Sequence, residues 1–318
     1  MALKTCLAII LGVGLVSCSE KKMVAQDSDR LKDRPAKEQI ISAGDLYGTL
    51  IDAGPSAPVV LIVPGSGPTD QHGNNPLGVK ADSYKLLAQA LAKVGVSTVR
   101  VDKRGMFASD KAGDPNAVTL DIYRQDYRDW ITAIRQRGEH DCIYLLGHSE
   151  GALMVSAAAH EREDVCGLIL VSGAGQPFGE LLRAQFRANP ANKPILQQAE
   201  KALDQLEKGE SVDTKTLHPA LASLFAAPVQ DFLKSILSAD PASMAATAKK
   251  ETLILHGDRD LQVDVSNARL LQEATQGSLV ILPEVNHILK AAPADPAGNF
   301  ATYGDPDLPI SQAAVKSE

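Results

Sequence analysis

A serine with a glycine two residues before it and another two residues after it is the clearest chemical feature of this sequence. Residues 147–151 read Gly-His-Ser-Glu-Gly, a G-x-S-x-G pattern centred on Ser149. The pattern is short enough to arise by chance. Here, however, it directly follows the apolar run 143–146 and precedes the small-residue stretch 152–159. This order of strand, turn and helix raises a serine hydroxyl above the edge of a sheet, so we expect Ser149 to be a nucleophile rather than a serine at an ordinary helix start.

A histidine and a carboxylate should follow in the chain, because a serine hydroxyl is a poor nucleophile until a base takes its proton. Two histidines, His256 and His287, lie in the last quarter of the sequence. His256 ends a buried apolar run, whereas His287 lies in the loop after the next one and also follows a suitable acid. We therefore assign His287 as the base. Spacing alone leaves the acid open between Asp258 and Asp260.

An oxyanion formed during acyl transfer needs two backbone N–H groups. One is expected from the residue after the nucleophile, which is Glu150. The other should come from the loop Pro-Gly-Ser-Gly-Pro-Thr-Asp at 64–70, where glycines allow close approach, and we assign it to Ser66 with Gly67 as second choice. A glycine-rich loop could also hold a phosphate. The sequence has neither G-x-x-x-x-G-K-[ST] nor G-x-G-x-x-G with a following acid, which disfavours a nucleotide cofactor.

Continuously apolar runs alternate with amphipathic stretches between residues 59 and 282, after an expected hairpin at 40–52. This alternation is typical of an α/β fold whose mostly parallel sheet is covered by helices on both faces. Functional side chains are then expected beyond the carboxyl ends of the strands. The expected buried strands are 59–63, 97–101, 143–146, 167–171, 252–255 and 279–282, and the expected helices between them lie at about 84–94, 120–136 and 151–160.

One connection is far longer than a crossover needs. About 80 residues separate the apolar runs that end at Val171 and begin at Thr252, where roughly 10–20 would suffice. The segment carries an apolar stripe at helical spacing and a helix start at Asp240-Pro241. We expect residues 176–249 to form a helical cap, whose stripe either packs on the core or lines an acyl pocket. The stripe consists of Val229, Phe232, Leu233, Ile236 and Leu237.

The order and spacing of the motifs resemble those of the α/β-hydrolase superfamily over residues 38–318. The motifs that carry the resemblance are GHSEG, PGSGPTDQHGNN, VDKRG and LILHGDRD. The PGSGPTDQHGNN loop is similar to that of exported esterases grouped with serine aminopeptidase-like or dienelactone-hydrolase-like proteins. The resemblance implies an eight-stranded, mostly parallel sheet, a cap inserted after strand six, and hydrolysis through an acyl-enzyme without metal or cofactor. It also places the acid three residues after a glycine, which favours Asp260 over Asp258.

The same resemblance bears on Cys142 and Cys166. In the family the strands beside these positions are neighbours, roughly 4.8 Å apart. Both cysteines lie seven residues before comparable strand ends, at Ser149 and Gly173. Their Cα atoms could then fall within the roughly 4.4–6.8 Å that a disulfide allows. A disulfide and a pair of free buried thiols both remain open.

The amino terminus has the layout of an export signal. Residues 1–17 carry one lysine followed by an apolar run that is shorter than the roughly 20 residues needed to span a bilayer. Residues 15–18, Leu-Val-Ser-Cys, resemble the lipobox of bacterial lipoproteins, which implies lipidation of Cys18 and a lipidated tether over 18–37. Ser19 favours the outer membrane. We therefore expect an exported protein on the periplasmic face of that membrane, attached only by its lipid.

Composition argues against nucleic acid as a partner. The 32 Lys and Arg against 39 Asp and Glu give a net charge of −7, and no basic block occurs, which argues against nucleic acid.

The leading hypothesis is a serine esterase for small-molecule esters of small to medium acyl chains. A serine peptidase acting on short peptides would use the same triad. A catalytically inactive lipoprotein that binds a partner is the alternative of another class.

Overall fold

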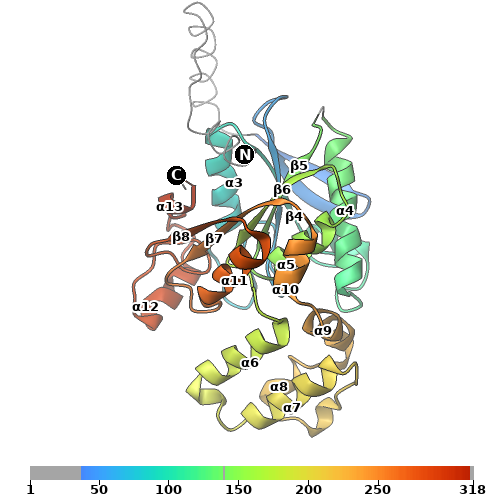
Figure 1. Ribbon diagram of the computed structural model, residues 1–318, viewed down its shortest axis with the longest axis vertical. Helices are drawn as coiled ribbons and strands as arrows, with labels where there is room; N and C mark the ends of the chain where they lie inside the picture. The colour runs from blue at the N-terminus through green and yellow to red at the C-terminus, as the bar shows by residue number, and fades with distance from the viewer. Residues whose placement is uncertain (1–36, 139, 316–318) are drawn as a thin grey trace, which may run out of the picture.

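The computed structural model describes residues 37–138 and 140–315, and it is built around one eight-stranded sheet of order β1-β2-β4-β3-β5-β6-β7-β8 (Figure 1). The expected hairpin is formed by β1 and β2, which turn at residues 44–45, and every pair from β4 to β8 is parallel. The strands are β1 (Glu38–Ala43), β2 (Leu46–Ile51), β3 (Val59–Val63), β4 (Ser97–Val101), β5 (Ile143–His148), β6 (Val165–Val171), β7 (Glu251–Gly257) and β8 (Ser278–Leu282). The expected lipidation at Cys18, the signal and nearly all of the tether lie outside the described residues.

Helices cover both faces of the sheet because its central strands are apolar on both sides. All five residues of β3 are buried. Val59, Leu61 and Val63 belong to one hydrophobic cluster, and Val60 and Ile62 belong to the other. One face is covered by α4 (Leu120–Arg135), α5 (Glu150–Ala159), α10 (Pro241–Thr247) and α11 (Ser266–Thr275) (Figure 1). The other face is covered by α3 (Ser83–Lys93) and α13 (Gln312–Val315). A short helix, α12 (Pro296–Ala301), precedes α13 in the chain.

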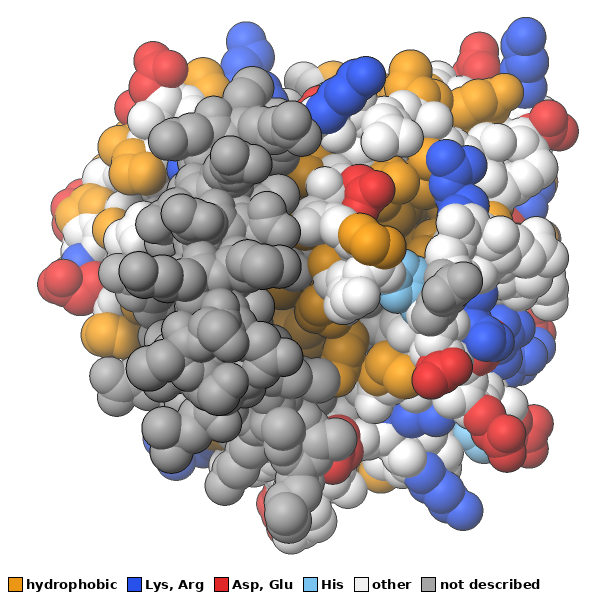
Figure 2. Space-filling model, turned by 90° about the horizontal axis from the view of Figure 1, so that it is seen from above, with side chains coloured by type: hydrophobic (Ala, Val, Ile, Leu, Met, Phe, Trp, Pro, Cys, Tyr) orange, Lys and Arg blue, Asp and Glu red, His pale blue; other side chains and the backbone are white. Residues whose placement is uncertain are grey.

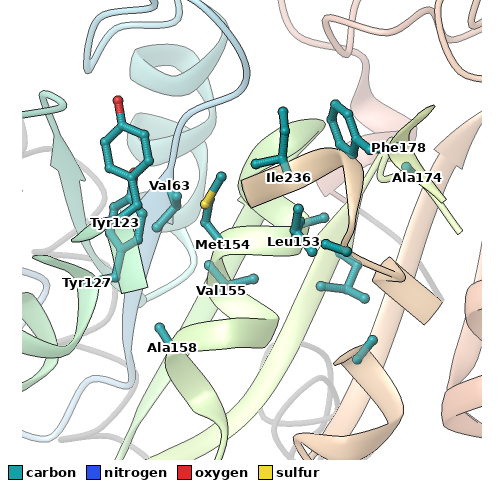
Figure 3. Close-up of a cluster of buried hydrophobic side chains, with 14 of the residues drawn as sticks. Val63, Tyr123, Tyr127, Leu153, Met154, Val155, Ala158, Ala174, Phe178 and Ile236 are labelled. Carbon is teal, nitrogen blue, oxygen red and sulfur yellow. The ribbon is translucent and has the colours of Figure 1, made fainter. Parts of the chain in front are cut away.

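Four helices between β6 and β7 project beyond the carboxyl ends of the strands (Figure 1). These inserted helices are α6 (Phe178–Ala188), α7 (Leu196–Glu207), α8 (Pro219–Ala222) and α9 (Gln230–Leu237). In Figure 3, Phe178 and Ile236 of this group belong to the same buried cluster as Leu153 and Met154 of α5. The expected cap at 176–249 therefore contains two kinds of helix. Helices α6 to α9 project beyond the strands, whereas the last helix, α10, packs on α5 and α11.

The segment 227–247 follows its local sequence signals. Asp240 is the N-cap of α10, its side chain accepts a hydrogen bond from the Ser243 amide, and Pro241 is the first helical residue. In α9, Leu233, Ile236 and Leu237 are buried. Most of the apolar stripe is thus used for packing within the hydrophobic core.

A disulfide joins Cys142 and Cys166, whose Cα atoms are 5.2 Å apart. Strand β6 begins at Val165, two residues earlier than the sequence suggested, so Cys166 lies inside the strand rather than before it. The register of β5 and β6 shifts here, because Val165 and Gly167 pair with the consecutive residues Ile143 and Tyr144. Cys166 is the extra residue of this bulge, opposite the start of β5.

Figure 2 shows the molecule from the end opposite the inserted helices. Lysine and arginine side chains are interspersed there with aspartate and glutamate over the described surface, and several apolar side chains gather towards the middle of the view. Within the described residues, no helix is both long and apolar enough to cross a membrane.

Candidate active site

Ser149 lies at the sharp turn between β5 and α5, with backbone angles φ 55° and ψ −120°. The two flanking glycines are required by close backbone approach. A Cβ on Gly147 would lie 2.2 Å from the main-chain oxygen of Gly151, and a Cβ on Gly151 would lie 2.5 Å from that of Val63. Ser149 is partly exposed, whereas the residues on either side of it are buried. The turn therefore presents one hydroxyl at the carboxyl end of the central strands.

His287 and Asp260 face each other from the loops after β8 and β7. His287 Nδ1 lies 2.7 Å from Asp260 Oδ2. The other carboxylate oxygen, Oδ1, accepts hydrogen bonds from the amides of Gln262 and Val263 at 2.8 and 2.9 Å. Burial raises the pKa of Asp260, but the charge and hydrogen bond of His287 and the Val263 amide outweigh burial and lower the pKa to about 2. Asp260 is thus ionised, and it orients His287 with Nε2 free to accept a proton.

Asp258, the other carboxylate that the sequence left open, has a different partner. Its Oδ1 accepts a hydrogen bond from the Glu284 amide at 2.7 Å. Asp258 therefore braces the turn after β8. Of the two acids, only Asp260 is hydrogen-bonded to His287.

His148, directly before Ser149, links the elbow to the loop of His287. Its Nε2 lies 2.7 Å from the main-chain oxygen of His287, which can only accept, so Nε2 carries the proton. Its Nδ1 then accepts from the Tyr84 hydroxyl at 2.8 Å, and that hydroxyl accepts from the Gly65 amide at 3.1 Å. Burial and the neighbouring His287 lower the pKa of His148 to about 3. A neutral histidine therefore ties three loops of the site together.

His256 supports the acid rather than acting as a base. It is fully buried, and its Nε2 donates to the main-chain oxygen of Val263 at 2.9 Å and lies 3.7 Å from Asp260 Oδ2. Burial lowers its pKa. His256 thus holds the turn that carries Asp260.

Two N–H groups beside Ser149 are available as donors. Within the described residues, the amides of Ser66 and Glu150 have no acceptor. The Gly65 amide is occupied by Tyr84, and a Cβ on Gly65 would lie 3.2 Å from Ser149 Cβ, so this loop packs directly on the elbow. The residues expected to form an oxyanion hole are therefore adjacent to the candidate nucleophile.

One contact expected of a triad is not formed in this structure. Within the described part of the chain, the Ser149 hydroxyl is not hydrogen-bonded to His287. The two residues are nevertheless brought together, because the rings of His148 and His287 are 4.8 Å apart. Hydrogen bonds of this kind often shorten only when substrate binds.

Tyr84, His148 and Lys103 are not among the predicted site residues. Tyr84 lies at the start of an expected helix, His148 is a variable position of the serine motif, and Lys103 is the central residue of the VDKRG motif. No local signal marks any of them, because their partners are distant in the chain. The described residues contain no group of three or more His, Cys, Asp or Glu side chains that could hold a metal ion.

Comparison with known proteins agrees with this geometry. Residues 75–290, more than half of the chain, match the serine aminopeptidase (S33) family. The chain belongs to this family. The matched region contains Ser149, Asp260, His287 and the inserted helices, whereas Ser66 of the oxyanion loop precedes it.

Two kinds of relative support the fold of this S33 family member. Esterase EstD of Thermotoga maritima is 25% identical over 240 residues, which are 73% of this chain and 54% of that protein, so the chain spans about half of that relative's length. Est1E from Butyrivibrio proteoclasticus aligns with a TM-score of 0.51 and 18% identity, covering 83% of this chain and 94% of Est1E. The alpha/beta hydrolase GrgF from Penicillium aligns with a TM-score of 0.51 and 19% identity over 79% and 90% of the two chains. The expected α/β-hydrolase fold is confirmed.

Proposed function

We propose that this chain is a serine esterase that cleaves carboxylic esters of small to medium acyl chains through an acyl-enzyme. Ser149 is the nucleophile, His287 the base and Asp260 the residue that orients it. The observation that carries the proposal is the 2.7 Å hydrogen bond between His287 and the ionised Asp260. The loop that contains His287 is held against the turn of Ser149 by a hydrogen bond from His148. The similarity to an esterase, EstD, supports ester rather than amide substrates.

The reaction follows from the positions of these groups. Ser149 Oγ attacks the ester carbonyl while His287 Nε2 takes the hydroxyl proton. The negative charge that develops on the carbonyl oxygen is stabilised by the amides of Ser66 and Glu150. When the carbon–oxygen bond to the alcohol breaks, His287 returns the proton to the leaving alkoxide. Water, activated by the same histidine, then hydrolyses the acyl-serine and releases the acid.

The deciding experiment is hydrolysis of p-nitrophenyl esters from acetate to palmitate by protein that begins at Ser19. We expect activity on short and medium esters that falls by about 10⁴ or more in Ser149→Ala. Ser156→Ala is the matched control, because Ser156 is buried in the same helix and donates only to the Ala152 main chain. Wild-type activity that survives in Ser149→Ala would contradict the proposed nucleophile.

A matched panel of aminoacyl and short peptide substrates separates the second candidate function. The family is described as serine aminopeptidases, and the same triad could cleave amides. Faster cleavage of these peptides than of every ester would replace the esterase proposal by a peptidase. A folded wild-type protein that is inactive on both panels would favour the inactive binding module.

We further propose that the chain is exported and anchored through a lipid on Cys18, on the periplasmic face of an outer membrane. The proposal is supported by the sequence around Cys18 alone. Metabolic labelling of the full chain with a palmitate analogue in a bacterial host tests it. Label should appear in the wild type and be lost in Cys18→Ala, with the wild type in the outer-membrane fraction. Equal labelling of the two proteins would overturn the anchor.

A further inference from the structure

Lys103 is a buried cation beside the candidate active site, and it has no role in the reaction described above. It lies two residues after β4, is 4% exposed, and donates from Nζ to the main-chain oxygen of Gly65 at 2.8 Å. A buried lysine is rare and destabilising unless it is paired and hydrogen-bonded. The group that Lys103 contacts should therefore account for the burial of this lysine.

That contact determines which way one peptide group points. The oxygen of Gly65 and the amide of Ser66 belong to the same peptide unit, and no peptide bond of the described residues is cis. In a trans peptide the C=O and N–H bonds point in opposite directions. Because Lys103 binds the oxygen, the Ser66 N–H points away from Lys103. The Gly65 N–H is already bound to Tyr84, so the loop is fixed on both sides of Gly65 and leaves the Ser66 amide free.

Lys103 also interacts electrostatically with the buried side chain of Glu150. The Glu150 side chain is 4% exposed, and Glu150 contributes its amide to the proposed oxyanion hole. Burial lowers the pKa of Lys103 and raises that of Glu150, and in both cases the opposite charge of the other residue counteracts the shift. A hydrogen bond from the Ser66 side chain also favours the Glu150 carboxylate. An unbalanced carboxylate here would repel an oxyanion, since electrostatic interactions are strong where water is excluded.

Resting on the proposed esterase function, we propose that Lys103 is a positioning residue of the oxyanion hole. It holds the Gly65–Ser66 peptide with its N–H available to the oxyanion beside Ser149. Lys103 does not touch the substrate. Its effect is therefore expected on the transition state more than on substrate binding.

The test compares Lys103→Met with Arg104→Met. Arg104 is the next residue and forms an ion pair with Asp126, but it contacts neither Gly65 nor Ser66, so its loss controls for removing a cation from this turn. Each variant is assayed for kcat and KM with p-nitrophenyl butyrate. Each is also titrated with butylboronic acid, which forms a tetrahedral adduct on an active serine and so mimics the transition state.

We expect Lys103→Met to lower kcat by about 10- to 100-fold with little change in KM, and to weaken boronic acid binding by a similar factor. Arg104→Met should bind the boronic acid like the wild type. Boronic acid affinity and kcat unchanged in folded Lys103→Met would overturn the inference and leave Lys103 a purely structural residue. Such a result would leave the esterase proposal intact, because wild-type activity and Ser149→Ala test that separately.

A double variant keeps the test valid if the single one unfolds. Lys103→Met removes the cation that favours the Glu150 carboxylate, whereas Lys103→Met with Glu150→Gln also removes the carboxyl group. The double variant should therefore be more stable to urea than Lys103→Met. It should still bind the boronic acid weakly, because the Gly65–Ser66 peptide has lost its support. Wild-type boronic acid affinity in the double variant would contradict a positioning role.

Discussion

His148 Nε2 donates a hydrogen bond to the main-chain oxygen of His287 at 2.7 Å. The residue directly before the candidate nucleophile thus holds the loop of the candidate base, although the two histidines are 139 positions apart in the chain. Since Nδ1 of the same ring is bound to Tyr84, which binds Gly65, one imidazole sets the relative positions of nucleophile, base and oxyanion loop. The site is organised by this neutral ring as much as by the triad itself.

Replacing His148 should therefore damage both activity and stability. His148→Phe keeps a ring of similar size but leaves the Tyr84 hydroxyl proton without an acceptor and the His287 oxygen without a donor, at about 1–3 kcal/mol of unfolding free energy for each. Small displacements of His287 should lower kcat by roughly 10- to 100-fold. Ester hydrolysis and urea unfolding measure the two effects. His160→Phe, at the far end of α5, should retain wild-type kcat, and a fully active His148→Phe would refute the linking role.

The pH dependence of stability should report the same residue. His148 titrates near 6.5 in an unfolded chain but at about 3 when folded, so between these values the unfolded state binds more protons. Its contribution to stability is complete above pH 6.5 and is lost as the pH falls towards 3, with a slope of up to about 1.4 kcal/mol per pH unit. Urea unfolding at pH 7.5 and pH 5 should show a smaller loss in His148→Phe than in the wild type. Equal losses in the two proteins would mean that His148 does not titrate in this way.

Asp260 and Asp258 form a matched pair for identifying the acid. Asp260→Asn removes the charge that stabilises protonated His287 and should lower kcat by a factor on the order of 10³–10⁴. Asp258→Asn changes a side chain that binds only the Glu284 amide, so kcat should stay close to that of the wild type. Steady-state kinetics of both variants decide the matter. A larger loss in Asp258→Asn than in Asp260→Asn would reverse the assignment.

The disulfide should stabilise the fold without affecting the chemistry. Cys142 and Cys166 enclose a segment with a sequence separation of 24, and they lie at the start of β5, at the opposite end of that strand from Ser149. Cys142→Ser with Cys166→Ser should lower the free energy of unfolding by about 2–4 kcal/mol and leave kcat unchanged at a temperature where the variant is folded. Urea unfolding with and without dithiothreitol measures the difference. A reductant that does not change wild-type stability would show that the bond contributes nothing.

The sequence by itself determined the elements and the candidate nucleophile. Continuous apolar runs, helical stripes and the Asp240-Pro241 start are local signals, and each appears in the structure within a few residues of its expected place. The elbow is equally local, because strand, turn and helix follow one another around Ser149 and both glycines are needed within that one turn. Backbone preferences and side-chain periodicity act over short stretches of chain, so they can be read directly from it.

Only the tertiary structure decided how the remaining residues pair. Asp258 and Asp260 are two positions apart, and the one that reaches His287 depends on how the loops after β7 and β8 meet. Likewise, Lys103 meets Gly65, and His148 meets His287, only because the parallel strands bring their carboxyl ends to one edge. A buried polar group must find a partner, and that partner is set by packing between segments far apart in sequence.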